Sequence, residues 1–505
     1  MKKVAEGYRL IFGYLGIFLA VVGTIIILPL VLLVIPSFHS DLQYWWNFLI
    51  PGASAIAVGF AMFFLFIGRR EKGQLKKHHD SILLVLVWLF AILISALPFY
   101  LSKEMNFTEA IFESTSGYCT VGLTRLPTKM YDSHIFTFYR AVLQFFGGVG
   151  LVLVVTSAIS DRYGLKLYVA EGHNDKLIPN LSKSARIILS IYVGYIILGT
   201  IAFRIAGVEW FDAMCHSISS VATGGFSSKA GGMLALSGNM LAIEIISCVL
   251  MFLGGTNFAL HMLLITGKFK KFFRDIEIRT FGIFVLLLVP FFVISFLLSV
   301  NPDTGANYTV AESFRYGLFA FMTGMTTTGY SNLQISGGIA LAPFGIIFLI
   351  ILTNVIGAGI GSTAGGAKLY RVGVSSKSYY WTLRKRLSPK RYIYPNYIWR
   401  FGERREVSSD EANEAFGYII LYIILLFVGS FLVSLIGGFD LSRSVFEFSN
   451  AISSTGLSNG LTAEAGKPVL WILITGMFAG RLEILVIFYA FVKVIKDVLR
   501  KHTIY

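Results

Sequence analysis

The chain has 505 residues, of which 55% are hydrophobic and only 14% are charged, and its formal net charge is +15. A soluble domain carries about 25% charged residues, and a soluble chain of this length divides into several domains joined by polar linkers. The mean hydropathy of +0.71 and the apolar runs from end to end therefore exclude a water-soluble enzyme and indicate a protein that crosses a membrane many times.

Ten segments are apolar over enough residues to cross a hydrocarbon core of about 30 Å, which takes about 20 helical residues. The first is too long for the core of a signal peptide, so we interpret it as a spanning helix. In chain order the predicted spans are residues 9–35, 47–68, 81–101, 135–160, 185–206, 239–266, 280–300, 341–370, 413–436 and 468–495.

Four shorter and less apolar segments lie between alternate pairs of these spans. They are too short to cross the bilayer, and each runs into a stretch rich in glycine, threonine and serine, which is typical of re-entrant elements. We expect short helices at residues 107–118, 210–221, 311–325 and 442–454.

The stretches that follow the short segments share the pattern [Thr/Ser]-x-Gly-[Leu/Phe/Tyr]-[Ser/Thr]. Its glycines are Gly122, Gly225, Gly329 and Gly456, at intervals of 103, 104 and 127 residues. Simple turns rich in glycine and serine would not keep phase with the helix pairs, so the pattern indicates an internal repeat. The sequence therefore predicts an all-α integral membrane protein. Two N-terminal helices precede four parallel helix–pore-loop–helix repeats, with pseudo-fourfold symmetry around a central ion pore.

This organisation divides the chain into six parts. They are two extra N-terminal helices (1–79), pore repeat 1 (80–166), pore repeat 2 (167–267), pore repeat 3 with a glycine-rich mid-membrane loop (268–376), a basic cytoplasmic linker (377–410) and pore repeat 4 (411–505).

The basic residues are distributed unevenly along the predicted topology. With the N-terminus in the cytoplasm, 33 of the 43 lysines and arginines face the cytoplasm, which is the asymmetry that sets orientation in membranes. This bias explains the net charge without a nucleic-acid partner, since no nucleic-acid-binding motif is present. The long basic loop at residues 371–410 is either a contact with lipid headgroups or a docking surface for a cytoplasmic partner. We expect a multi-pass protein of the cell membrane with both termini in the cytoplasm.

The four glycine patterns carry the chemistry that we expect. Irregular backbone at membrane depth is tolerated where it is buried or lines a water-filled path, and rings of carbonyl oxygens can replace the hydration shell of a monovalent cation. Glycine permits the backbone conformations that such rings need. The candidate cation-binding filter residues are Thr120, Val121, Gly122, Thr223, Gly224, Gly225, Thr327, Thr328, Gly329, Ser454, Thr455 and Gly456. Candidate supports of the filter are Glu113 and Glu447, each nine residues before its glycine, with Arg140 and Asn257.

The eighth predicted span contains five glycines between Asn354 and Gly366, and each costs about 1 kcal/mol relative to alanine in a helix. Composition leaves two interpretations open: a broken helix whose loop crosses the pore and moves aside, or close helix packing through small residues. Arg481 lies inside another apolar segment, where it either forms an ion pair, for example with Glu483, or projects its charge into the pore. The candidate gate residues are Gly357, Gly359, Gly361, Ser362, Thr363, Gly365, Gly366 and Arg481.

Over nearly its whole length the chain resembles the Trk/Ktr/HKT superfamily of potassium transport proteins, specifically a Trk-type membrane subunit. Besides the four glycine patterns, the matching stretches are residues 139–148, 254–258, 354–368 and 480–483. The resemblance implies a homodimer in which each protomer has its own pore, and a cytoplasmic ring of nucleotide-binding regulatory subunits of the RCK/KTN type. It also implies that the loop at 357–366 is the gate, that Arg481 faces the pore, and that glycine rather than serine at position 122 goes with K⁺ permeation.

We therefore expect regulated potassium uptake through a gated, channel-like pore, with K⁺ bound at the filter residues. No covalently bound cofactor is expected, and the regulatory nucleotide is expected on the partner subunit. The alternatives are a Na⁺/K⁺ symporter of the same fold and an alternating-access transporter for another solute, which would need inverted repeats. An enzyme is not expected, because the sequence has no HExxH motif, no Gly-x-Ser-x-Gly elbow and no paired intramembrane aspartates.

Overall fold

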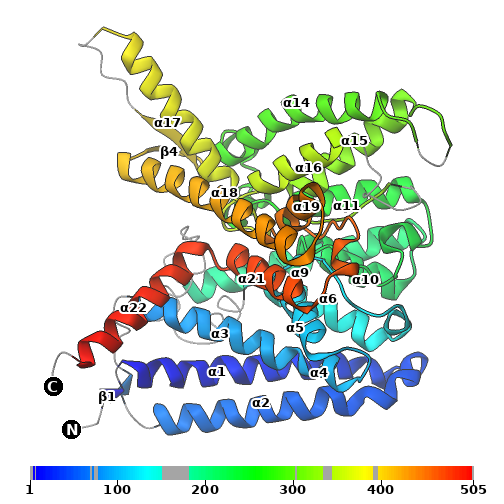
Figure 1. Ribbon diagram of the computed structural model, residues 1–505, viewed down its shortest axis with the longest axis vertical. Helices are drawn as coiled ribbons and strands as arrows, with labels where there is room; N and C mark the ends of the chain where they lie inside the picture. The colour runs from blue at the N-terminus through cyan, green and yellow to red at the C-terminus, as the bar shows by residue number, and fades with distance from the viewer. Residues whose placement is uncertain are drawn as a thin grey trace.

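The computed structural model describes residues 4–5, 7–68, 71–72, 78–150, 181–301, 304–333, 344–389 and 396–502. In these ranges the chain is mostly helical, with two short pairs of strands (Figure 1). A mostly helical fold with several long apolar helices agrees with the fold class that the sequence predicts.

Two long helices near the N-terminus lie side by side at one edge of the molecule (Figure 1). A Cβ atom on Gly16 would lie 2.5 Å from the carbonyl oxygen of Gly59, so small residues set the close spacing of the two helices. The elements of this pair are α1 (Tyr8–Ile27), η1 (Leu28–Val34), η2 (Pro36–Tyr44) and α2 (Trp45–Phe66). They cover the first two predicted spans.

The four short helices lie within two residues of their predicted bounds. They are α5 (Phe107–Tyr118), α10 (Trp210–Val221), α15 (Val310–Met325) and α19 (Leu441–Ile452). Two of them begin with a capping box, in which Asn106 pairs with Glu109 and Thr309 pairs with Glu312. These reciprocal hydrogen bonds satisfy backbone N–H groups that a helix start leaves without partners, which fixes where each helix begins.

Each short helix lies between two longer helices in the chain. The longer helices are α3 (His79–Ser95) with its extension α4 (Leu97–Leu101), α6 (His134–Val149), α9 (Leu181–Ile205), α11 (Met240–Gly254), α14 (Ile276–Leu297), α16 (Phe344–Ile356), α18 (Ser409–Gly437) and α21 (Lys467–Arg481). Residues 151–160 and 341–343, which belong to two predicted spans, lie outside the described ranges. Within those ranges α6 and α16 are shorter than a spanning helix.

Two predicted spans are not single helices. The span at 239–266 consists of α11 and α12 (Phe258–Ile265), which meet at 110°, and the span at 468–495 consists of α21 and α22 (Ile484–His502), which meet at 98°. Asn257 leaves the helical conformation and accepts a hydrogen bond from the Ala259 amide at 2.8 Å, so it starts a new helix. At the second break Glu483 has a positive φ of 58°. The described ranges thus hold six spanning helices, or up to eight if each bent pair counts as one.

The eighth predicted span is broken at its glycines, which is one of the two interpretations that composition left open. Helix α16 ends at Ile356, and a non-helical segment of residues 357–368, here named the crossing loop, leads to α17 (Leu369–Leu387). In Figure 1 α17 projects from the helical body, with a β-hairpin near its base. The hairpin consists of the antiparallel strands β3 (Tyr397–Arg400) and β4 (Glu403–Glu406).

The remaining short elements are β1 (Val4–Ala5), which pairs in parallel with β2 (Glu71–Lys72), η3 (Thr128–Asp132), η4 (Gly232–Ala235), α13 (Phe269–Phe272) and α20 (Leu461–Glu464).

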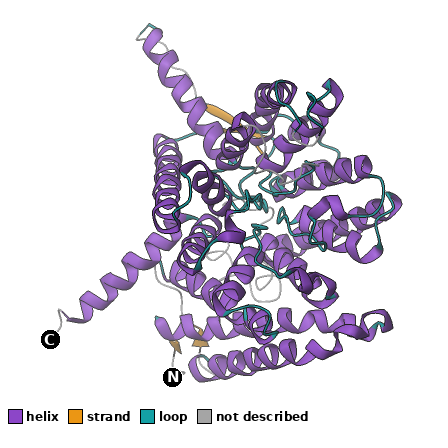
Figure 2. Ribbon diagram, turned by 45° about the vertical axis from the view of Figure 1, so that its right-hand side comes forward, coloured by secondary structure: helices purple, strands orange, loops and turns teal. Residues whose placement is uncertain are grey.

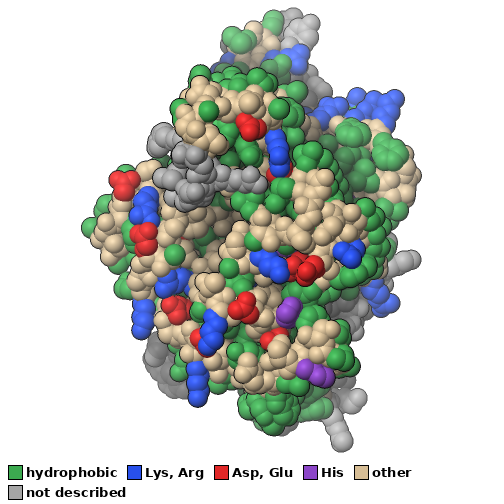
Figure 3. Space-filling view, turned by 90° about the vertical axis from the view of Figure 1, so that its right-hand side faces the viewer, with side chains coloured by type: hydrophobic (Ala, Val, Ile, Leu, Met, Phe, Trp, Pro, Cys, Tyr) green, Lys and Arg blue, Asp and Glu red, His purple; other side chains and the backbone are tan. Residues whose placement is uncertain are grey.

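The largest buried cluster joins side chains from both ends of the chain, because α3 packs against α22 and α5 against α21. Large apolar side chains face outward on the long helices; on α18, for example, Phe427 is 63% exposed and Leu435 is 65% exposed. Exposed apolar helix faces of this kind are expected where lipid replaces water. The end of the molecule seen in Figure 3 instead carries interspersed acidic and basic side chains.

Candidate functional site

Four loops with one backbone conformation follow the short helices. They are named the glycine loops and comprise residues 119–124, 222–227, 326–331 and 453–458. Two residues before each glycine of the repeat, a threonine or serine adopts a positive φ, which is uncommon for residues other than glycine. The values are 51° at Thr120, 48° at Thr223, 54° at Thr327 and 58° at Ser454.

A matching hydrogen bond ends each short helix. The amide that follows the positive-φ residue donates to the carbonyl five residues earlier, as in the common C-terminal helix motif. These bonds join Val121 to Ser116 at 2.9 Å, Gly224 to Ser219 at 2.8 Å, Thr328 to Thr323 at 2.9 Å and Thr455 to Asn450 at 2.8 Å. The local sequence repeat therefore corresponds to a repeat of backbone geometry.

The glycine loops meet one another in the middle of the helical body (Figure 2). A Cβ atom on Gly122 would lie 2.6 Å from the carbonyl oxygen of Gly224, and one on Gly225 would lie 2.1 Å from that of Thr328. The ring closes through the third and fourth loops: a Cβ atom on Gly329 would lie 2.2 Å from the Gly456 nitrogen, and one on Gly456 would lie 2.5 Å from the Val121 oxygen. Side chains at these positions would collide with the neighbouring backbone, so the ring requires glycine.

A cavity of about 490 Å³ adjoins this ring and is lined by all four repeat glycines. Polar side chains surround it, among them Thr124, Arg140, Ser227, Ser331 and Ser458. The fold therefore brings the four glycine loops, which are far apart in the sequence, to one polar cavity.

Glu113 and Arg140 form a buried ion pair beside the first two glycine loops. Their Oε1 and Nε atoms are 2.7 Å apart, and the two side chains are 0% and 1% exposed. Glu113 also accepts hydrogen bonds from the Thr124 hydroxyl and the Arg125 amide, while Arg140 donates to the Ser227 carbonyl at 3.1 Å. The pair thus fixes one glycine loop to the next.

Glu447 holds the fourth glycine loop in the way that Glu113 holds the first. It accepts hydrogen bonds from the Ser458 hydroxyl at 2.6 Å and from the Asn459 amide at 3.1 Å. These donors follow Gly456 by two and three residues, just as the donors to Glu113 follow Gly122. The second loop uses a different carboxylate: Asp212, which accepts from the Ser228 hydroxyl at 2.7 Å.

Sequence reasoning did not identify Asp212 or Gln144 as site residues. Gln144 lies in α6 and donates to the Gly224 carbonyl at 2.5 Å, within the second glycine loop. A buried amide in an apolar helix was the available signal, since buried polar groups need hydrogen-bond partners.

The crossing loop lies directly against three glycine loops. The Thr363 hydroxyl is 2.9 Å from that of Thr223, and the Gly365 amide donates to the Thr327 hydroxyl at 2.7 Å. A Cβ atom on Gly365 would lie 2.0 Å from the Ser453 carbonyl oxygen, in the fourth glycine loop. The loop is also folded back on itself, because a Cβ atom on Gly357 would lie 2.1 Å from the Gly365 oxygen.

Other predicted gate residues take part in the same folded segment. Gly357, Gly361 and Gly366 have positive φ values of 69°, 66° and 79°. Gly359 donates from its amide to the Gly255 carbonyl at 2.9 Å and accepts at its own carbonyl from the Ser362 hydroxyl at 2.6 Å. The glycines of the crossing loop therefore allow positive φ values and close contact between backbone segments. They do not pack one unbroken helix against another.

Arg481 joins the crossing loop to α6. Its guanidinium donates to the Thr363 carbonyl at 2.8 Å, to the Gly148 carbonyl at 3.2 Å and to the Gly147 carbonyl. Glu483, which the sequence offered as an ion-pair partner, instead pairs with Arg371 at 2.8 Å. A positive charge is therefore held beside the crossing loop by backbone carbonyl groups.

Asn257 differs from its predicted place among the supports of the glycine loops. It lies at the break between α11 and α12, and its side-chain amide donates to the Ile360 carbonyl of the crossing loop at 2.5 Å. This hydrogen bond joins the break between α11 and α12 to the non-helical crossing loop. In the described ranges no three histidine, cysteine, aspartate or glutamate side chains gather in a way that could hold a metal ion.

The sequence model of the TrkH family, described as cation transport proteins, matches residues 46–498 of the chain. The Trk system potassium uptake protein TrkH of Escherichia coli K12 is 30% identical over 453 residues, which cover 86% of this chain and 89% of that protein. An uncharacterized cation transporter of Methanocaldococcus jannaschii is 28% identical over 497 residues, which cover 97% of this chain and 96% of its own length.

A solved structure has the same fold. The crystal structure of the potassium transporter TrkH from Vibrio parahaemolyticus superposes with a TM-score of 0.80 at 24% identity, covering 96% of this chain and 98% of that one. The family match extends over most of the chain and includes all four glycine loops, the crossing loop and Arg481. The chain belongs to the TrkH family of cation transport proteins.

Proposed function

We propose that this protein takes up K⁺ through a pore whose selectivity filter is the ring of four glycine loops. The observation that carries the proposal is the mutual contact of Gly122, Gly225, Gly329 and Gly456 in chain order around one point. Relatives named as potassium uptake proteins support K⁺ as the transported ion.

The proposed architecture is two N-terminal helices followed by four parallel helix–pore-loop–helix repeats around a pseudo-fourfold axis. The shared positive φ values and the shared helix-ending hydrogen bonds support equivalence of the four units. We place the repeats at residues 80–166, 167–267, 268–376 and 411–505, with the basic linker at 377–410. Both termini lie in the cytoplasm of a cell whose membrane the chain spans, as the excess of basic residues on that side supports.

In the filter, carbonyl oxygens of the glycine loops replace the water that K⁺ loses on entry. The carboxylate-based hydrogen bonds of Glu113 and Glu447 keep the first and fourth loops at fixed positions. Fixed carbonyl positions favour one ion size. Glycine at position 122 adds no side-chain hydroxyl at that point of the ring.

The crossing loop is the gate of this pore in its closed position. It is packed against the second, third and fourth glycine loops and is buried, with Thr363 and Ala364 0% exposed. The Arg481 charge beside it opposes the passage of cations. Opening requires this segment to move away from the ring.

The functional unit is a homodimer in which each protomer has its own pore, regulated by a cytoplasmic ring of nucleotide-binding subunits. The exposed basic end of α17, with Arg384, Lys385 and Arg386, supports a cytoplasmic contact of this kind. The nucleotide binds to the partner, and K⁺ is cargo rather than a resident cofactor.

Flux into liposomes tests the proposed function. Purified protein is reconstituted with internal K⁺, and uptake of ⁸⁶Rb⁺ is competed with external K⁺, Rb⁺, Na⁺ or Li⁺, with protein-free liposomes as control. K⁺ and Rb⁺ should compete and Na⁺ and Li⁺ should not. Equal competition by all four ions would refute K⁺ selectivity, and the absence of any protein-dependent uptake would refute conduction.

A further inference from the structure

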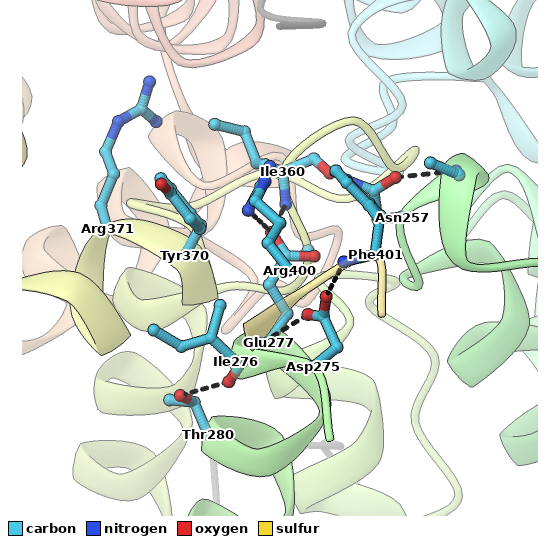
Figure 4. Close-up of polar contacts among 12 residues, drawn as sticks. Asn257, Asp275, Ile276, Glu277, Thr280, Ile360, Tyr370, Arg371, Arg400 and Phe401 are labelled. Carbon is cyan, nitrogen blue, oxygen red and sulfur yellow. Dashed lines mark hydrogen bonds and ion pairs between the residues drawn. The ribbon is translucent and has the colours of Figure 1, made fainter. Parts of the chain in front are cut away.

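Ile360, in a turn of the crossing loop, is held by side chains from outside the loop at both of its backbone polar groups. Its amide donates to Glu277 Oε1 at 3.0 Å, and its carbonyl accepts from Asn257 Nδ2 at 2.5 Å (Figure 4). Asn257 belongs to the break between α11 and α12, whereas Glu277 is the second residue of α14. The position of the crossing loop therefore depends on where the Glu277 carboxylate lies.

The Glu277 carboxylate is buried, with the residue 2% exposed, and an arginine of the β-hairpin faces it. Arg400 Nη1 is 3.8 Å from Glu277 Oε1, the same oxygen that accepts the Ile360 amide. The Arg400 guanidinium also lies 3.8 Å from the centre of the Tyr370 ring, and the residue is 6% exposed (Figure 4). The hairpin thus places a buried positive charge beside the acceptor that holds the crossing loop.

The hairpin is fixed to this site by a second carboxylate. Asp275 accepts the Phe401 amide at 2.9 Å with Oδ2 and the Glu277 amide at 2.9 Å with Oδ1. Phe401 and Gly402 form the tight turn of the hairpin, with positive φ values of 49° and 82°. One side chain therefore joins the hairpin turn to the backbone of Glu277.

Apolar packing connects the same parts. Ile360 of the crossing loop, Ile398 of β3 and Tyr370 of α17 belong to one buried cluster, in which Ile398 is 0% exposed. Displacement of the hairpin would expose this cluster and would remove the charge that faces Glu277. Both consequences act on Ile360.

We propose that Arg400 and Glu277 are positioning residues through which the β3–β4 hairpin holds the crossing loop in its closed position. The proposal rests on the proposed function of the crossing loop as a gate. Removing one member of a buried charged pair leaves the other without compensation, so the closed arrangement loses stability relative to any state in which Glu277 is rehydrated. Because the hairpin lies in the predicted cytoplasmic linker, a displacement of the hairpin outside the membrane would reach the gate through these two side chains.

The test measures ⁸⁶Rb⁺ flux through the full-length protein in liposomes without any partner subunit. Arg400→Ala and Glu277→Gln should each raise this basal flux about tenfold, because a hydrogen bond or contact involving a charged group is lost from the closed state. The matched control is Arg404→Ala, which removes an exposed arginine from the other strand of the same hairpin and should leave basal flux unchanged. Flux of Arg400→Ala equal to that of Arg404→Ala would overturn the proposal.

A double-variant experiment separates positioning from general loosening of the fold. In a background carrying Arg481→Ala, which frees the crossing loop directly, Arg400→Ala should add little flux, because both changes act on the same segment. If the fold-increases in flux of the two single variants multiply fully in the double variant, the proposal is overturned. If Arg481→Ala and shortening of residues 357–366 themselves leave flux unchanged, the gate assignment fails. If those changes raise flux and Arg400→Ala does not, only the hairpin proposal fails.

A chemical readout covers the case in which Arg400→Ala does not fold well enough for flux measurements. Ser362→Cys is introduced into a chain whose Cys119, Cys215 and Cys248 are replaced by alanine, and its reaction rate with a small cationic thiol reagent is measured. Glu277→Gln should raise the rate about tenfold, since residue 362 becomes accessible when the loop moves. An unchanged rate would overturn the proposal.

Discussion

The ion pair between Glu113 and Arg140 offers a quantitative test of how the glycine loops are held. Replacing Arg140 by methionine keeps the apolar stem and removes the charge, so Glu113 remains as a buried carboxylate. Breaking a buried pair in this way costs about 3–5 kcal/mol. Glu113 retains its hydrogen bonds from the Thr124 hydroxyl and the Arg125 amide, so we expect a loss near the lower end, about 3 kcal/mol.

The free energy of unfolding is measured by denaturant titration in mixed micelles, with Arg443→Met as the matched control. Arg443 pairs with Glu464, and these side chains are 38% and 57% exposed, so its loss should cost about 0–1 kcal/mol. The double variant Glu113→Gln/Arg140→Met should regain more than half of the Arg140→Met loss, since no buried charge remains. Equal losses for Arg140→Met and Arg443→Met would refute the reasoning, as would a double variant less stable than both single variants.

Three further changes probe the ring and the gate. Arg481→Ala removes charged hydrogen bonds to the Thr363 and Gly148 carbonyls, each worth about 1.5–3 kcal/mol, so basal ⁸⁶Rb⁺ flux should rise at least about tenfold. Unchanged flux would argue against a role of Arg481 in closing the pore. Gln144→Leu removes the 2.5 Å hydrogen bond to the Gly224 carbonyl and should lower the K⁺/Na⁺ permeability ratio, measured from reversal potentials, about fivefold. An unchanged ratio would show that Gln144 does not support the filter. Gly225→Ala places a Cβ atom 2.1 Å from the Thr328 oxygen at a φ of 74° and should abolish flux without preventing membrane insertion; wild-type flux would contradict the ring geometry.

Local sequence patterns predicted the elements whose determinants are local. The short helix at Phe107–Tyr118 begins with its own capping box, and Thr120 with its positive φ follows two residues after its end, so all of these determinants are close in sequence. The glycines after Asn354 left a broken helix and close helix packing both open, and the family resemblance favoured the break that the structure shows after Ile356.

The features that sequence reasoning missed depend on partners far along the chain. The bends near Asn257 and Glu483 interrupt apolar runs that have no proline at or near the bend, and Asn257 is held by Ile360, more than 100 residues away. Gln144 and Asp212 resemble ordinary buried polar residues until the second glycine loop is folded beside them. The hairpin lies in a segment with many basic residues. Nothing in the sequence distinguished the buried Arg400 from the exposed arginines near it.

The central claim is that the four glycine loops select K⁺ as one ring. The most direct measurement is the K⁺/Na⁺ permeability ratio of Gly122→Ser, obtained from reversal potentials in reconstituted bilayers and compared with wild type under identical ion gradients. A Cβ atom at position 122 would lie 2.6 Å from the Gly224 oxygen, so serine must displace the neighbouring loop and add a hydroxyl to the ring. The account predicts that wild type prefers K⁺ and that Gly122→Ser shifts the ratio toward Na⁺. An unchanged ratio in a conducting Gly122→Ser protein would contradict it.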